Sequence, residues 1–168
     1  MNNIRTVIFD YGGVLCRLPS DEQIQAFARR CGLSVEDFNK HFWHFRLQYD
    51  RGDFDGPGYW RAIGRVSGKE YTPSEIETFI EEDVKLWLEM EPRMLQWNRL
   101  LRGAGIRTAV ISNMPEELGR HLWGHSNIFT EFENVTLSYE VRSAKPEAKI
   151  YRNCIAKLGI KSGDALFL

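Results

Sequence analysis

The sequence contains no long apolar run, and none of its segments approaches the roughly 18 apolar residues of a membrane-spanning helix. Its three cysteines, Cys16, Cys31 and Cys154, are odd in number and form no C-x-x-C pair, so we expect reduced thiols instead of a disulfide framework. Basic and acidic residues nearly balance, 22 against 23, which argues against an extended nucleic-acid-binding surface. Residues 1–5 carry no apolar stretch of the signal-peptide type. These absences favour a cytoplasmic protein without a membrane or nucleic-acid partner.

The chain has the length of one domain with room for an insertion, at 168 residues. A short β-branched run over residues 6–9 predicts a buried strand that ends at Asp10. From residue 92 onward, strand patterns alternate with helix patterns. Further strands are predicted over residues 108–111, 135–138 and 165–168. Such alternation is typical of a parallel sheet with helices on its faces.

The segment between the first strand and residue 92 carries helix patterns throughout. Ser20 stands at an N-cap position, and the T-P-S-E sequence at residues 72–75 is a capping box with proline at the first helical position. We therefore predict an α/β protein with a Rossmann-like parallel sheet. Residues 1–15 and 92–168 would form its core, and residues 16–91 an inserted α-helical cap.

Polar residues follow three of the predicted strands. Asp10 comes after the first strand, Ser112 and Asn113 after the second, and Lys145 lies in the loop after the third. In open parallel sheets, ligands bind at the carboxyl ends of the strands, so we expect these side chains to meet. A carboxylate there can act as a nucleophile, a hydroxyl can hold phosphate oxygens, and a lysine can neutralise their charge.

In their order and spacing, these segments resemble the haloacid dehalogenase superfamily of hydrolases, in the group with a helical cap after the first strand. The resemblance covers the whole chain. The matching sequences are V-I-F-D-Y-G-G-V-L at 7–15, R-G-D at 51–53 with Tyr59 and Trp60, V-I-S-N at 110–113, and S-A-K-P-E at 143–147 with Ile150 and Tyr151.

The resemblance implies a phosphomonoester hydrolase that acts on a small phosphorylated metabolite. Asp10 would attack the phosphorus and form an aspartyl-phosphate, while Lys145 would hold both Asp10 and the phosphoryl group. Ser112 and Asn113 would bind the phosphoryl oxygens. Gly13 would bring the backbone close to the substrate, since glycine tolerates the bent conformation that such an approach needs.

The resemblance also implies Mg²⁺ as the cofactor. Asp10 and the backbone carbonyl of Gly12 would be ligands, which suits a hard cation that prefers oxygen donors. The family's further acidic ligand follows a strand like that at residues 165–168. The sequence ends at Leu168, so we expect this acidic ligand, and the C-terminal part of the core, to be absent.

Gly12 departs from the pattern of many phosphatases of the family, which carry a second aspartate there as a general acid and base. Such catalysis contributes about 10²–10⁴-fold, so we expect substrates with good leaving groups, such as sugar 1-phosphates, to be favoured. Two alternatives stay open: a 2-haloacid dehalogenase, whose halide leaves without a proton, and a catalytically impaired binding or regulatory protein. Arg46, Tyr49 and Arg51 are candidate substrate contacts from the cap. The oligomeric state is open.

Overall fold

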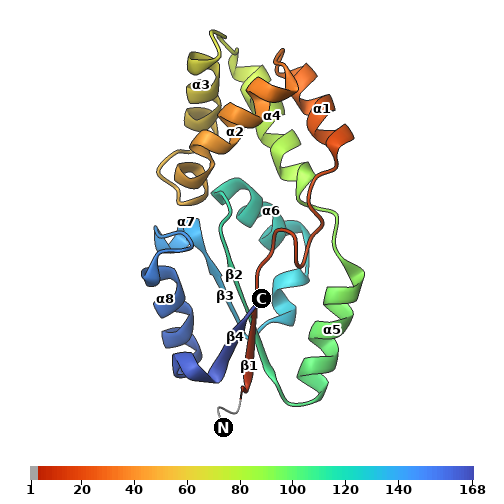
Figure 1. Cartoon of the computed structure of the whole chain (residues 1–168), viewed down its shortest axis with the longest axis vertical. Helices are drawn as coiled ribbons and strands as arrows, with labels where there is room; N and C mark the ends of the chain where they lie inside the picture. Colours follow the sequence, from red (N-terminus) through yellow and green to blue (C-terminus); the bar gives the residue numbers. More distant parts are fainter. Residues whose placement is uncertain (1–3) are drawn as a thin grey trace.

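The computed structural model describes residues 4–168, so the first three residues of the predicted core lie outside the described part. Within residues 4–168, four parallel strands form one sheet in the order β3-β2-β1-β4 (Figure 1). The strands are β1 (Thr6–Phe9), β2 (Arg107–Ser112), β3 (Asn134–Leu137) and β4 (Ala165–Phe167). The predicted parallel α/β fold is confirmed, with strand bounds within a residue of those expected.

Between β1 and residue 92 the chain forms four helices, which lie together beyond the carboxyl ends of the strands (Figure 1). They are α1 (Asp21–Arg30), α2 (Val35–Asp50), α3 (Gly56–Val66) and α4 (Pro73–Leu86). Each begins with an N-cap side chain that accepts a hydrogen bond from the main-chain N–H three residues later. The caps are Ser20, Ser34, Asp55 and Thr72. The capping box predicted at Thr72 is confirmed.

The chain enters and leaves this group of helices side by side. The Arg17 N–H donates to the Glu89 carbonyl at 2.7 Å, and the Glu91 N–H donates to the Leu15 carbonyl at 2.9 Å. The Arg17 guanidinium also pairs with the carboxylates of Glu89 and Glu91. The four helices therefore lie in one chain segment whose two ends are hydrogen-bonded to each other.

The remaining helices flank the sheet. They are α5 (Pro92–Gly103), α6 (Glu116–His125), α7 (Ser138–Val141), α8 (Ala148–Leu158) and the 3₁₀ turns η1 (Ile128–Glu131) and η2 (Ser162–Asp164). The short helix α7 differs from the sequence-based expectation, which ended a strand at Ser138. Gly159 adopts φ 65° and ends α8, as its position predicted. Within residues 4–168, every helix is too short or too polar to cross a membrane.

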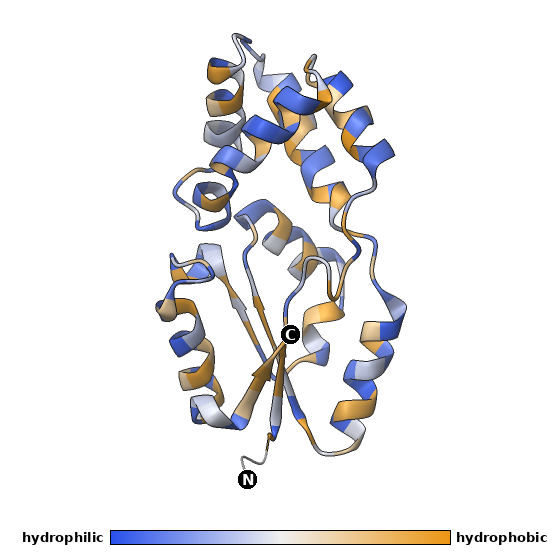
Figure 2. Ribbon diagram, viewed as in Figure 1, coloured by the Kyte–Doolittle hydropathy of each residue, from blue (hydrophilic) through white to orange (hydrophobic). Residues whose placement is uncertain are grey.

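Strands β1 and β2 bury apolar side chains on both faces of the sheet, whereas β4 leaves Leu166 and Phe167 exposed; apolar residues colour much of the strands orange in Figure 2. On one face, Ile8 and Ile111 pack with Ile150 of α8. On the other face, Phe9 and Val110 belong to a larger cluster that includes residues of α6. Burial on both faces is why these strands carry continuous apolar runs instead of alternating ones.

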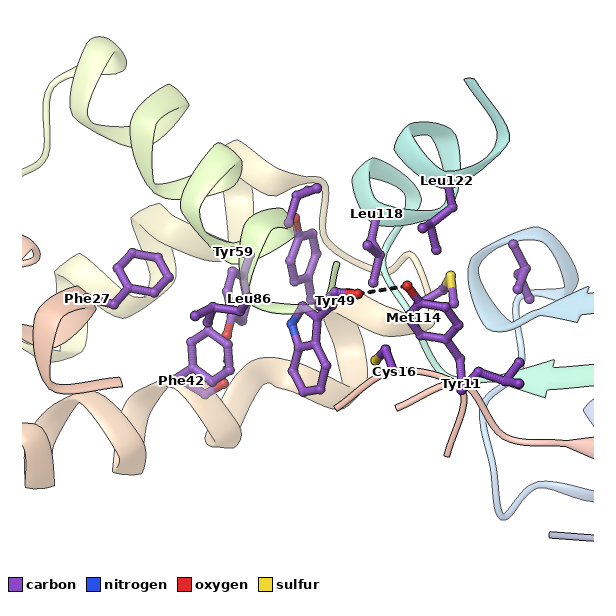
Figure 3. Packing of buried hydrophobic residues seen from close by; sticks show 14 of the residues in the cluster. Tyr11, Cys16, Phe27, Phe42, Tyr49, Tyr59, Leu86, Met114, Leu118 and Leu122 are labelled. Carbon is purple, nitrogen blue, oxygen red and sulfur yellow. Dashed lines mark hydrogen bonds between the residues drawn. The ribbon is translucent and has the colours of Figure 1, made fainter. Parts of the chain in front are cut away.

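That larger cluster continues from the sheet into the helical group (Figure 3). Tyr11, Met114 and Leu118 at the sheet edge share it with Leu86 and Trp87 at the end of α4. Fully burying a side chain of this size contributes about 1.5–3 kcal/mol. The apolar contact therefore fixes the position of the helices relative to the carboxyl ends of the strands.

Candidate active site

Asp10 and Lys145 meet at the carboxyl end of the sheet. Asp10 follows β1 directly, and its Oδ2 lies 2.5 Å from the Lys145 Nζ. The other carboxylate oxygen, Oδ1, accepts a hydrogen bond from the Tyr11 main-chain N–H at 2.7 Å. Both oxygens therefore have a donor, which fixes the orientation of the carboxylate. Charge-assisted bonds of this kind are about twice as strong as neutral ones.

The Asn113 side chain holds the loop that carries Lys145. Its Oδ1 accepts from the Lys145 main-chain N–H at 2.7 Å, and its Nδ2 donates to the Lys145 carbonyl at 3.1 Å. The Lys145 Nζ also reaches the Ile111 carbonyl at 3.4 Å. The end of β2 therefore positions the ammonium group. The Asn113 side-chain amide, which we predicted to bind substrate, makes both of these hydrogen bonds to the main chain of Lys145.

A cavity of about 260 Å³ opens above the ion pair. Its lining from the sheet edge is Asp10, Tyr11, Gly12, Asn113, Lys145 and Leu118; from the helical side come Leu18, Trp43, Arg46, Asp50 and Trp87. A cavity near this size, with apolar walls and a few convergent polar groups, suits a small molecule.

Two predicted substrate-binding residues are not part of this lining. Ser112 is buried, and its hydroxyl donates to the Asn113 carbonyl at 3.3 Å. Gly13 adopts φ 78°, as the bent turn requires, and its N–H donates to the Cys16 carbonyl at 2.9 Å. The structure thus brings Asp10 and Lys145 into contact, while the parts assigned to Ser112 and Gly13 stay predictions.

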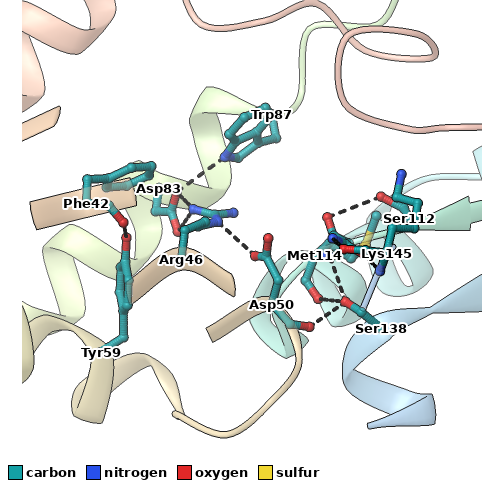
Figure 4. Close-up of polar contacts among 11 residues, drawn as sticks. Phe42, Arg46, Asp50, Tyr59, Asp83, Trp87, Ser112, Met114, Ser138 and Lys145 are labelled. Atoms are coloured by element: carbon teal, nitrogen blue, oxygen red, sulfur yellow. Dashed lines mark hydrogen bonds and ion pairs between the residues drawn. The ribbon is translucent and has the colours of Figure 1, made fainter. Parts of the chain in front are cut away.

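A buried ion-pair network forms the helical side of the cavity (Figure 4). The Arg46 Nε lies 2.8 Å from Asp50 Oδ1, and the Arg46 Nη1 lies 2.8 and 3.0 Å from the two oxygens of Asp83. The Trp87 indole N–H adds a bond to Asp83 at 3.3 Å. Sequence reasoning missed both carboxylates. A signal was present, since Phe42, Arg46 and Asp50 follow at steps of four and share one face of α2.

The network holds two carboxylates and one guanidinium. Burial, together with the neighbouring Asp83 carboxylate, raises the pKa of Asp50 to about 6 against the opposing effect of Arg46 and Lys145. Burial alone lowers the pKa of Arg46, but the two carboxylates together hold it well above its usual value. Arg46 is therefore charged at every pH of interest, and Asp50 is the carboxyl of the network that burial makes harder to ionise.

Polar contacts join the end of α2 to the loops around Lys145. The Ser138 hydroxyl donates to the Asp50 carbonyl and accepts from the Met114 N–H at 2.9 Å. The Arg51 Nη1 lies 2.9 Å from a carboxylate oxygen of Glu147, two residues after Lys145. These contacts hold Asp50 over the sheet edge. Of the three substrate contacts expected from the cap, only Arg46 lines the cavity, whereas Tyr49 is buried and Arg51 is ion-paired.

The sequence model of the haloacid dehalogenase-like hydrolases matches residues 4–168. The chain belongs to this family. Among curated relatives of this haloacid dehalogenase-like hydrolase is the D-ribitol-5-phosphate phosphatase of Bacteroides thetaiotaomicron. The two are 23% identical over 180 aligned residues, which span 98% of this chain and 82% of that protein.

Solved structures show the same fold. A HAD family enzyme from Bacteroides thetaiotaomicron, in complex with magnesium and inorganic phosphate, superposes with a TM-score of 0.76 at 20% identity, covering 98% of this chain and 84% of that one. The L-2-haloacid dehalogenase from Xanthobacter autotrophicus gives a TM-score of 0.67 at 20% identity, covering 98% and 69%. The predicted family and fold class are therefore both confirmed.

The oxygen donors at the cavity of this hydrolase are few. Within the described residues, no three His, Cys, Asp or Glu side chains gather in a way that could hold a metal ion. At the sheet edge the donors are the Asp10 carboxylate and the Gly12 carbonyl, on which no main-chain hydrogen bond of residues 4–168 ends. This pair fits Mg²⁺, which keeps several waters and takes one or two carboxylates together with substrate phosphate.

Proposed function

We propose that this chain hydrolyses the phosphomonoester of a small phosphorylated metabolite, with Mg²⁺ as cofactor. The contact between Asp10 and Lys145 inside the cavity carries the proposal, because it pairs a nucleophile with a cation that can neutralise phosphoryl charge. The phosphatase among the relatives and the magnesium and phosphate in the superposed structure support it.

In the proposed reaction the Asp10 carboxylate attacks phosphorus. The bond from phosphorus to the alcohol oxygen breaks as the aspartyl-phosphate forms, and water then releases inorganic phosphate and restores Asp10. The Lys145 ammonium neutralises charge on the carboxylate and on the phosphoryl oxygens throughout. When bound, Mg²⁺ supplies further charge neutralisation. Asp10 and the Gly12 carbonyl are the groups of this chain that would hold it.

The helices α1–α4 act as the cap in this proposal, as the division into residues 16–91 and the core predicted. Trp43 and Trp87 line the cavity on the helical side, and a cap in this position would limit the access of water to the reacting phosphoryl group. Gly12 supplies no proton to the leaving group, so with respect to this position alone we propose that sugar 1-phosphates and other esters with good leaving groups are favoured.

The test is hydrolysis of 4-nitrophenyl phosphate with and without Mg²⁺, beside an Asp10→Asn variant. An aryl leaving group needs little protonation, so the glycine at position 12 does not mask activity. We expect Mg²⁺-dependent turnover that disappears in Asp10→Asn. Absence of turnover by folded wild-type protein would contradict the proposal. Turnover of a 2-haloacid without Mg²⁺ would support the dehalogenase instead.

A further inference from the structure

We propose that Asp50 is the general acid and base of the reaction, acting on the leaving group from the helical side of the cavity. The inference rests on the proposed phosphatase function and adds a catalytic residue to it. Asp50 lines the same cavity as Asp10 and Lys145, and the contacts of Ser138 and Arg51 keep it there.

The chemistry needs a proton that the other residues of the cavity do not offer. An alkoxide that leaves phosphorus must be protonated, and a positioned acid contributes about 10²–10⁴-fold. Asp10 is the nucleophile, and Lys145 is paired with it. Arg46 cannot lose its proton. The Tyr11 hydroxyl donates to the Trp87 carbonyl at 2.7 Å, and burial raises the pKa of Tyr11 far above neutrality.

Asp50 has a free oxygen that reaches the cavity. Its Oδ1 accepts the hydrogen bond of Arg46 Nε, while its Oδ2 takes no hydrogen bond from any group in residues 4–168. That oxygen is not fully buried, and Asp50 lines the cavity. The side chain is nevertheless about nine-tenths buried, at 10% exposure, which limits its contact with bulk water.

The two carboxylates bound to Arg46 differ in the number of hydrogen bonds that they accept. The groups that face it are Arg46 on its own helix, Asp83 on α4, and Lys145 from the sheet edge. Asp83 binds Arg46 through both oxygens and also accepts the Trp87 N–H, whereas Asp50 binds Arg46 through one oxygen. The Asp50 carboxylate therefore accepts fewer hydrogen bonds than the Asp83 carboxylate does. The pKa of about 6 agrees with this geometry and lies near neutrality, where a general acid is most effective.

The proton balance closes over the two steps. In the first step the bond from Asp10 to phosphorus forms, the bond from phosphorus to the alcohol oxygen breaks, and the Asp50 proton passes to that oxygen. In the second step water attacks the aspartyl-phosphate, and Asp50, now a carboxylate, accepts a proton from that water. Inorganic phosphate leaves, Asp10 is again a carboxylate, and Asp50 is again protonated. One ester and one water give one alcohol and one phosphate.

The test compares two leaving groups in Asp50→Asn, with Mg²⁺ present. One substrate is 4-nitrophenyl phosphate, and the other is the alkyl phosphate that the wild type hydrolyses fastest in a panel of sugar and polyol phosphates. We expect the alkyl phosphate to lose about 10²–10⁴-fold in kcat/KM. The aryl phosphate should give a burst of one nitrophenolate per protein followed by slow turnover, with phosphorylated protein visible by intact mass spectrometry.

Asp83→Asn is the matched control, because Asp83 binds the same guanidinium without lining the cavity. We expect it to slow both substrates alike and to give no burst. A burst in Asp83→Asn, or equal losses on both substrates in Asp50→Asn, would assign the effect to the position of Arg46 and overturn the proposal.

A second measurement needs no variant. In the wild type, kcat/KM for the alkyl phosphate should fall tenfold per pH unit above the pKa of Asp50, while kcat/KM for the aryl phosphate, whose leaving group needs no acid, stays level. Coincident profiles would overturn the role of Asp50. If the wild type is active, Asp10→Asn is inactive and the two pH profiles coincide, only the role of Asp50 is contradicted. If the wild type itself is inactive, the proposed phosphatase function is contradicted as well.

Discussion

Removing the Asp83 carboxylate should destabilise the whole protein. Asp83 is 2% exposed and binds the Arg46 guanidinium through both oxygens, at 2.8 and 3.0 Å. Asp83→Ala leaves a buried cation with one carboxylate partner and frees the Trp87 indole N–H. Breaking a buried pair in this way costs about 3–5 kcal/mol of the free energy of unfolding. For a chain of this length, 1 kcal/mol corresponds to about 2–4 °C in Tm, so we expect a decrease of about 6–20 °C.

The assay is urea denaturation followed by tryptophan fluorescence, with Glu116→Ala as the control. Glu116 pairs with Arg120 on the surface, where the two side chains are 47% and 77% exposed, and such pairs contribute about 0–1 kcal/mol. Asp83→Asn keeps the volume and one acceptor oxygen, so its loss should be smaller than that of Asp83→Ala. If Asp83→Ala costs no more than the surface control, the argument that Arg46 depends on this partner is refuted.

Three further outcomes are expected. Lys145→Met should lower kcat/KM for 4-nitrophenyl phosphate by about 10²–10³-fold, because the charge beside Asp10 is lost, while circular dichroism shows an unchanged fold. The raised pKa of Asp50 means that the native state holds this proton more tightly than the unfolded chain, so its contribution to stability falls as pH rises from about 4 to 6. Asp50→Asn should therefore gain about 3 kcal/mol relative to wild type between pH 4 and pH 7 in urea unfolding. On α6, Gly119→Ala should lower the free energy of unfolding by about 1–3 kcal/mol, because its new methyl group would lie 2.4 Å from a tyrosine ring. Gly124→Ala, whose methyl group meets nothing within 4 Å, should instead stabilise the protein by about 0.5–1 kcal/mol. Equal thermal shifts for the two variants would contradict this.

The fold was predictable because its signals are local. The apolar strand before Asp10, the N-cap serine and threonine residues, and the glycine that ends α8 each act within a few residues, and the structure confirms them. The contact between Asp10 and Lys145 follows from one further rule, that the carboxyl ends of parallel strands share an edge. The division of the chain into core and cap stays a prediction.

The other side of the cavity could not be predicted in this way. Asp50 and Asp83 lie on different helices, and only the tertiary arrangement, in which α2 and α4 both pack against α3, brings them to one guanidinium. Ser112 shows the converse case, since its residue type suits phosphate binding while its buried hydroxyl bonds to the main chain. The helix α7 has four residues, which is too short for a periodic pattern to appear.

The hydrogen bonds between the two ends of the segment that holds α1–α4 have a consequence for how the chain folds. Thr6 of β1 lies beside Arg107 of β2, so this pairing closes a loop of about 100 residues. Once Arg17 and Glu89 are hydrogen-bonded, the helices between them no longer count toward that loop, and the effective length falls about fourfold. Each halving lowers the entropic cost of closure by about 0.6 kcal/mol, which amounts to about 1.2 kcal/mol in total. Early folding of the helices would therefore accelerate the assembly of the sheet beneath them.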